Sequence, residues 1–197
     1  MYDRPAQKRP LIIGNWKMNG TRGEAEILAD AIVEGTTYPH TVLCPPFTAL
    51  ETVNRVVAGS PISLGAQDCH DIESGAFTGD ISASMLSACG CQYVLVGHSE
   101  RRHYHHETDA LIARKAQAAI RHDLIPVICI GETLEQRTQG EEVNIVHKQL
   151  QHAVPPESTP ENTVIAYEPV WAIGTGKVPT PEEIVEIHAA IATQKPG

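Results

Sequence analysis

The sequence predicts an α/β fold built on a parallel sheet. Short runs of β-branched and apolar residues alternate with helical segments that carry their own start signals, which is the pattern of repeated βα units. The apolar runs are nearly continuous, as expected for strands that are covered on both faces. With 197 residues, 42% of them hydrophobic, the chain can bury one substantial core. We therefore expect residues 1–197 to form a single domain.

Six segments are predicted to be strands, because each is a short apolar run rich in β-branched residues. They are Leu11–Asn15, Thr41–Cys44, Ile62–Ala66, Tyr93–Gly97, Pro126–Ile130 and Thr163–Tyr167. Their periodicity fits two architectures equally well, a doubly wound open sheet and a (βα)-barrel.

Helix starts are predicted between these strands from capping boxes, in which a threonine is followed three residues later by a glutamate. The pairs are Thr21 with Glu24, Thr48 with Glu51, and Thr180 with Glu183. A further helix is expected over Thr108–His122, where apolar residues recur at helical spacing. The proline-rich stretch Val154–Thr163 is expected to be a surface connection and not a domain linker.

Composition limits the classes of function. The formal net charge of −9 and the sequence pI near 5.5 argue against a protein that coats nucleic acid or an anionic membrane. The first ten residues contain no apolar signal region, and no run approaches the roughly 18 apolar residues that a membrane span needs. We therefore expect a cytoplasmic protein, whose five scattered cysteines are reduced and mostly buried.

Polar side chains that follow three of the predicted strands are candidates for catalysis. Asn15 and Lys17 follow the first strand, His98 the fourth and Glu168 the sixth. In parallel α/β folds, loops at the carboxyl ends of strands converge on one face. Each residue alone is a weak signal, but together they supply a carboxamide, a cation, an imidazole and a carboxylate. This set suits removal of a carbon-bound proton next to a carbonyl group.

The segment after Glu168 is predicted to be a mobile lid. Pro169 and Pro179 bracket a run with Gly174 and Gly176 in a small, apolar centre. Such a lid would exclude water from the site. An ordinary glycine-containing surface loop is the alternative.

Three segments resemble the signature segments of the triosephosphate isomerase family, in that family's order and at similar separations. They are Asn15-Trp16-Lys17-Met18-Asn19, Gly97-His98-Ser99-Glu100-Arg101-Arg102, and Ala166-Tyr167-Glu168-Pro169-Val170-Trp171-Ala172-Ile173-Gly174-Thr175-Gly176. Gly75-Ala76-Phe77-Thr78-Gly79-Asp80 likewise resembles the family's dimer-interface loop. The similarity runs from about Pro10 to the last residue.

The resemblance implies a TIM (βα)8-barrel, of which this chain holds roughly the first six βα units and is truncated at its C-terminus. It also implies a cytoplasmic, homodimeric isomerase of glycolysis and gluconeogenesis that interconverts dihydroxyacetone phosphate and glyceraldehyde 3-phosphate through an enediol(ate). No cofactor, metal, nucleic acid or membrane partner is implied.

The same resemblance assigns roles to individual residues. Glu168 would be the base that moves the proton, strengthened by desolvation under the lid, and His98 a neutral electrophile. Lys17 would face the substrate phosphate and the developing charge, and Asn15 would bind a substrate oxygen. Three further roles follow from it: Glu100 would support the catalytic network, Gly174 would offer its N–H to the phosphate, and Thr78 would reach the partner subunit's site.

Other interpretations are weaker. His103, His105 and His106 beside Glu107 could suggest a metal site, but they lack a metal-binding spacing. Gly174-Thr175-Gly176-Lys177 lacks the first glycine and the final hydroxyl of a P-loop. Cys129 has no identifiable partner base for a nucleophilic role. A non-catalytic barrel fragment also stays open, because barrels of this kind need about 250 residues.

Overall fold

A computed structural model describes residues 10–194. Six strands form one sheet in the order β1-β2-β3-β4-β5-β6, and every neighbouring pair is parallel. The strands are β1 (Ile12–Asn15), β2 (Thr41–Cys44), β3 (Ile62–Ala66), β4 (Tyr93–Val96), β5 (Ile125–Ile130) and β6 (Val164–Tyr167). All six predicted strands are confirmed, with ends that differ by one residue at most.

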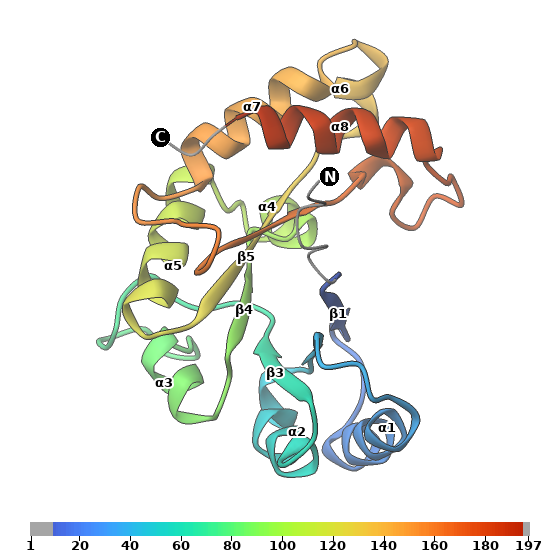
Figure 1. Cartoon of the computed structure of the whole chain (residues 1–197). Coiled ribbons are helices and arrows are strands. Elements are labelled where there is room, and N and C mark those ends of the chain that lie inside the picture. The colour runs from blue at the N-terminus through green and yellow to red at the C-terminus, as the bar shows by residue number, and fades with distance from the viewer. Residues whose placement is uncertain (1–9, 195–197) are drawn as a thin grey trace, which may run out of the picture.

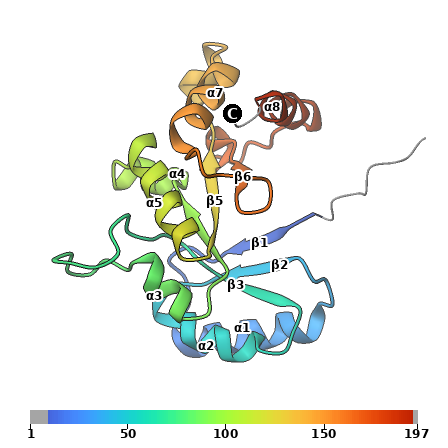
Figure 2. The ribbon, with the colours of Figure 1, turned by 60° about the vertical axis from the view of Figure 1, so that its left-hand side comes forward.

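The order of the strands decides between the two architectures that the sequence left open. A doubly wound sheet reverses its strand order at a switch point, whereas each strand here lies beside the next one along the chain. The sheet curls with its helices on the outside, so that α1 and α8 lie at opposite ends of the curl (Figures 1 and 2). The fold is therefore α/β, a six-stranded part of a TIM barrel.

The ten helical elements include two short 3-10 turns. They are α1 (Arg22–Gly35), η1 (Phe47–Ala49), α2 (Leu50–Val57), α3 (Ala83–Ala88), α4 (Ser99–Tyr104), α5 (Asp109–Arg121), α6 (Leu134–Thr138), α7 (Glu142–Ala153), η2 (Val170–Ala172) and α8 (Pro181–Thr193) within residues 10–194.

Two of the three predicted capping boxes are confirmed. Thr21 and Thr180 each accept a hydrogen bond from the backbone three residues on, and the glutamate there returns one. The prediction at Thr48 is wrong. Thr48 lies inside η1, and α2 begins at Leu50 after an alanine that makes no side-chain cap. The turn that leaves β2 is thus wound as a 3-10 segment, which satisfies its amides without a threonine cap.

The core has two parts, one on each face of the sheet. The larger lies between the strands and the helices and includes Leu64, Leu86, Ile112 and Ile128. The smaller lies inside the curl, where Val42, Cys44, Leu95 and Val127 pack together. The helix predicted over residues 108–122 is confirmed as α5.

The edges of the curl are less well covered than its centre. Among the described strands, β1 and β6 each have one neighbour. Every residue of β2 is buried, whereas those of β6 are only half-buried. Ile12 of β1 keeps 54% of its surface exposed. Edge strands of this kind offer unpaired backbone groups to another polypeptide.

Two further expectations bear on the chemistry of the chain. All five cysteines are free thiols, and four of them are buried while Cys89 is exposed, which confirms the expectation that the thiols are mostly buried. Among residues 10–194, no helix combines the length and the apolar character that crossing a bilayer requires.

Candidate active site

Lys17 lies in a strained turn at the carboxyl end of β1. Its φ of 54° is in the left-handed region, which costs a residue with a side chain about 1–3 kcal/mol. Asn15 Oδ1 accepts the Lys17 N–H at 3.0 Å. Gln67 Nε2 donates to the carbonyl oxygens of Lys17 (2.9 Å) and Cys44 (2.8 Å). The turn is therefore held from both sides, and Gln67, which sequence reasoning missed, ties it to β2.

This turn directs the Lys17 side chain toward α4. Lys17 Nζ lies 2.7 Å from Glu100 Oε1, and the two side chains are 38% and 42% exposed. An ion pair this open to solvent contributes little to stability. Its importance is geometric, because it joins the β1 segment to the segment that follows β4.

The imidazole of His98 is oriented by the backbone of α4. His98 is the N-cap of this helix, and its Nδ1 accepts the Glu100 N–H at 3.2 Å. Glu100 Oε2 also lies 3.5 Å from Nδ1, but this separation is longer than an ordinary N–H···O bond. Since Nδ1 is an acceptor, the neutral ring carries its proton on Nε2. Nε2 lies 2.9 Å from Glu168 Oε1 and donates to it.

Glu168 is held as a carboxylate by two donors. Oε1 accepts from His98, and Oε2 accepts the Ser99 N–H at the start of α4 (3.0 Å). Burial raises the pKa of Glu168, but the hydrogen bonds from His98 and Ser99 outweigh burial and hold the pKa below its ordinary value. In this arrangement the net shift is thus downward, because both oxygens are bonded to donors, and the expectation of a base strengthened by desolvation under the lid stays a prediction.

The start of the predicted lid is anchored on a carboxylate that sequence reasoning missed. Glu132 is fully buried just after β5, and its Oε1 accepts from Tyr167 Oη (3.0 Å), Trp171 Nε1 (2.8 Å) and Arg137 Nη1 (3.0 Å). The guanidinium of Arg137 also lies 4.9 Å from the centre of the Trp171 ring. The sequence signal that could have identified Glu132 is its position just after a predicted strand. These contacts fix η2 in place.

The remaining predicted site residues lie apart from this cluster. Gly174 and Gly176 adopt positive φ values of 69° and 76° in the exposed part of the predicted lid. Thr78 is exposed in the loop between Gly75 and Gly79. Within residues 10–194, neither Thr78 nor Gly174 shares a hydrogen bond with Asn15, Lys17, His98, Glu100 or Glu168.

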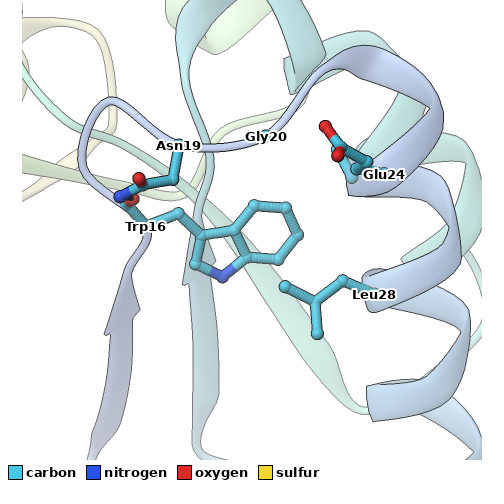
Figure 3. A pocket seen from close by; sticks show the side chains of 6 residues that line it. Trp16, Asn19, Gly20, Glu24 and Leu28 are labelled. Atoms are coloured by element: carbon cyan, nitrogen blue, oxygen red, sulfur yellow. Dashed lines mark hydrogen bonds between the residues drawn. The ribbon is translucent and has the colours of Figure 1, made fainter.

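An open cavity of about 460 Å³ lies beside the first signature segment, between the β1–α1 turn and α1. Trp16 and Leu28 face each other across it, and Asn19, Gly20, Glu24 and Ala25 complete its lining (Figure 3). None of the candidate catalytic residues lines it. In the described part of the chain this cavity lies on an open side of α1, whereas the candidate catalytic residues lie at the strand ends.

The structure also bears on the weaker interpretations. In the described part of the chain, no group of three or more His, Cys, Asp or Glu side chains is arranged so that it could hold a metal ion. Glu107 instead pairs with Arg101 (2.7 Å) and Lys115 (2.6 Å). Burial raises the pKa of Cys129 well above that of a free thiol, which opposes a nucleophilic role.

Known proteins with similar sequences share one description. The profile of the triosephosphate isomerase family matches residues 10–196. Triosephosphate isomerase of Xanthobacter flavus is 49% identical over 187 residues, which cover 94% of this chain and 75% of that protein. The enzyme of Rhizobium etli is 50% identical, with 92% and 72% covered.

A solved structure agrees with the sequence comparison. The crystal structure of triosephosphate isomerase from Bartonella henselae superimposes with a TM-score of 0.87 at 43% identity, over 94% of this chain and 75% of that one. The chain thus spans about three quarters of the relatives that it matches. With the profile, the sequences and the fold in agreement, this chain belongs to the triosephosphate isomerase family.

Proposed function

We propose that the site formed by Glu168, His98, Lys17 and Asn15 interconverts dihydroxyacetone phosphate and glyceraldehyde 3-phosphate. The observation that carries this proposal is the 2.9 Å contact between His98 Nε2, which bears the N–H of the neutral ring, and the Glu168 carboxylate. A carboxylate base and a neutral N–H donor are thereby held side by side. They are the two groups that an aldose–ketose isomerisation through an enediol needs.

In the forward direction, Glu168 takes a proton from C1 of dihydroxyacetone phosphate. The electrons of the C–H bond form the C1–C2 double bond, and those of the C2 carbonyl move onto its oxygen. His98 Nε2–H and the Lys17 ammonium stabilise the charge that develops there, and Asn15 binds a substrate oxygen. Return of the proton from Glu168 to C2, with transfer of the O1 proton to O2, yields the aldehyde. Each role is filled by a protein group.

Glu168 must leave its donors before it can act. In the described arrangement both oxygens accept hydrogen bonds, and the pKa of the carboxylate is lowered. Movement of the backbone from Pro169 onward would withdraw Glu168 from Ser99 and His98, raising its basicity as the lid closes. Gly174 would then bring its backbone N–H to the substrate phosphate. Glu100 would hold Lys17 until the anionic substrate arrives.

The same family membership supports a proposed assembly and a proposed cellular setting. Thr78 lies in an exposed loop, where it could enter the site of a second copy in a symmetric homodimer. Such an enzyme would work in the cytoplasm within glycolysis and gluconeogenesis. One barrel domain over residues 1–197 would hold every residue named above.

A second candidate function is a non-catalytic barrel fragment. The observation that favours it is that β1 and β6 each have one neighbour among the described strands, so that the sheet does not close within residues 10–194. A phosphate group bound at the strand ends would have fewer backbone donors around it than in a closed barrel. Binding without turnover would then be expected.

One experiment separates the two candidates. Glyceraldehyde 3-phosphate would be supplied to the 197-residue chain, and to the same chain extended by the last quarter of the Xanthobacter flavus enzyme, in deuterium oxide. The isomerase proposal predicts that the extended chain forms product and incorporates deuterium when the proton held by Glu168 exchanges with solvent before its return, with both lost in the Glu168→Gln variant. The non-catalytic alternative predicts that the 197-residue chain forms no product. Turnover that survives this substitution would refute the assignment of the base.

A further inference from the structure

The base is supported from α7 by a side chain that the mechanism does not use. Gln149 Oε1 accepts the N–H of Gly131 at 2.7 Å, and Gln149 Nε2 donates to the carbonyl oxygen of the same glycine at 3.1 Å. Only one orientation of the amide group satisfies both bonds. The Gln149 side chain thus forms hydrogen bonds with both the N–H and the carbonyl group of Gly131.

The two groups that Gln149 holds belong to different peptide planes. The Gly131 N–H shares its plane with the carbonyl of Ile130, which accepts the N–H of Glu168 at 2.8 Å. The Gly131 carbonyl shares its plane with the N–H of Glu132, the residue that anchors Trp171. Because a peptide unit is rigid, fixing one of its groups fixes the other. Gln149 therefore orients the supports of both the base and the lid.

The close approach of Gly131 to the base adds a second restraint. A Cβ atom on Gly131 would lie 1.8 Å from the carbonyl oxygen of Glu168. The carbonyl group of Glu168 therefore packs against Gly131, and the Glu168 N–H donates to the carbonyl oxygen of Ile130. A shift of the Gly131 peptides of a few tenths of an ångström would move the Glu168 backbone with them.

We propose that Gln149 is a positioning residue, which sets the place of Glu168 and the start of the lid through the two peptide groups of Gly131. This inference rests on the proposed isomerase function for its catalytic consequence. Its structural content, the restraint on the Glu168 backbone, is independent of that function.

The test uses amide hydrogen exchange, which reports on the restraint without turnover. In Gln149→Met, which keeps the length of the side chain but not its hydrogen bonds, we expect the Glu168 and Gly131 amide protons to exchange at least tenfold faster. Amide protons of β2 should be unchanged, which would distinguish local loosening from loss of stability. The matched control is Gln151→Met on the same helix, an exposed residue, which should exchange like the parent.

A second variant separates the two hydrogen bonds. Gln149→Glu retains an acceptor for the Gly131 N–H, but its carboxylate cannot donate to the Gly131 carbonyl at neutral pH. We expect exchange intermediate between the parent and Gln149→Met, with recovery as acid protonates the introduced carboxyl group. Where turnover is measurable, Gln149→Met should lower kcat at least fivefold with little change in KM.

The outcomes keep the two proposals apart. The positioning role would be overturned if the Glu168 amide proton of Gln149→Met exchanged at the same rate as in the parent. It would also be overturned if exchange became faster by the same factor over the whole sheet. Faster local exchange in a chain that shows no isomerase activity even when extended would support the positioning role and refute the proposed reaction.

Discussion

The carbonyl oxygen of Glu168 lies where the side chain of residue 131 would begin, 1.8 Å from the position of a Cβ atom on Gly131. Non-bonded atoms cannot approach so closely, and the obstructing atom belongs to the backbone. The strand ends of β5 and β6 can therefore meet in this way only if residue 131 is glycine.

Gly131→Ala should displace the proposed base. We expect the methyl group to push the Glu168 backbone outward, lengthening the contact between Glu168 and His98, and to destabilise the fold by about 1–3 kcal/mol through overpacking. Urea unfolding would measure the stability, and the His98 ring resonances in NMR spectra would report the contact. Gly23→Ala is the control, because a Cβ at that exposed position of α1 meets nothing within 4 Å. Unshifted His98 resonances would contradict the prediction.

Shortening the base separates catalysis from binding. Glu168→Asp keeps the charge but withdraws the carboxylate by one methylene group, about 1.5 Å. Because proton transfer depends on placement to a fraction of an ångström, we expect kcat in the extended chain to fall by about 10²-fold or more. Affinity for a phosphate-bearing inhibitor should change less than threefold. Unchanged kcat would show that another group removes the proton.

The direction of the Glu168 pKa shift predicts how stability depends on pH. A carboxyl group whose pKa is lower in the folded chain than in the unfolded one stabilises the fold at pH values above the unfolded pKa, about 4.3. This contribution is lost as the pH falls through the folded pKa, which lies below its ordinary value. Glu168→Gln should therefore be less stable than the parent at pH 7, with a difference that narrows below pH 4. Denaturant unfolding at both pH values measures it, and a constant difference would contradict it.

The fold could be predicted from sequence further than the site could. Continuous apolar runs located all six strands, because burial on both faces leaves a signal in each run. Strand order could not be read in this way, since periodicity describes one strand at a time. The 3-10 turn at Thr48 was missed because a threonine and a glutamate three residues apart do not reveal how the chain leaves the preceding strand.

Within the site, the residues at the strand ends could be predicted and their supports could not. Asn15, Lys17, His98 and Glu168 stand out by position, and contacts link them in the structure. Gln67 and Gln149 form hydrogen bonds with backbone groups that are distant in the sequence, and a local sequence pattern cannot indicate such contacts. The lowered pKa of Glu168 was likewise missed, because it depends on two donors that reach it only in the folded chain.

The hydrogen bond between Trp171 and Glu132, at the start of the predicted lid, gives a prediction that does not depend on turnover. Trp171→Phe keeps an aromatic ring in place but removes the N–H that donates to Glu132 Oε1 at 2.8 Å. Since Glu132 is fully buried and its Oε2 already has no partner among the described residues, loss of a donor should cost about 1–3 kcal/mol. The cost should appear as faster amide exchange in residues 170–176. Equal exchange in the parent and in Trp171→Phe would show that the hydrogen bond does not hold the lid.

The open edges predict the behaviour of the 197-residue chain when it is made alone. Ile12 of β1 and Leu28 of α1 are 54% and 47% exposed, and Leu28 faces the cavity beside Trp16. We expect self-association at micromolar concentrations, because edge strands and apolar side chains are uncovered together. We also expect isomerase activity about 10³-fold or more below that of the extended chain, since the proposed phosphate site would have fewer backbone donors than in a closed barrel and each hydrogen bond to a charged group contributes about 1.5–3 kcal/mol.

Light scattering and the coupled isomerase assay measure these two quantities. Leu28→Asp should hinder packing of the added segment in the extended chain, whereas Ile27→Asp, one position along the same helix and outside the lining of the cavity, should not. The two substitutions differ only by about 100° around the helix axis. Equal activity in the two forms of the chain would show that the residues at the strand ends of β1, β4 and β6 are sufficient for the reaction.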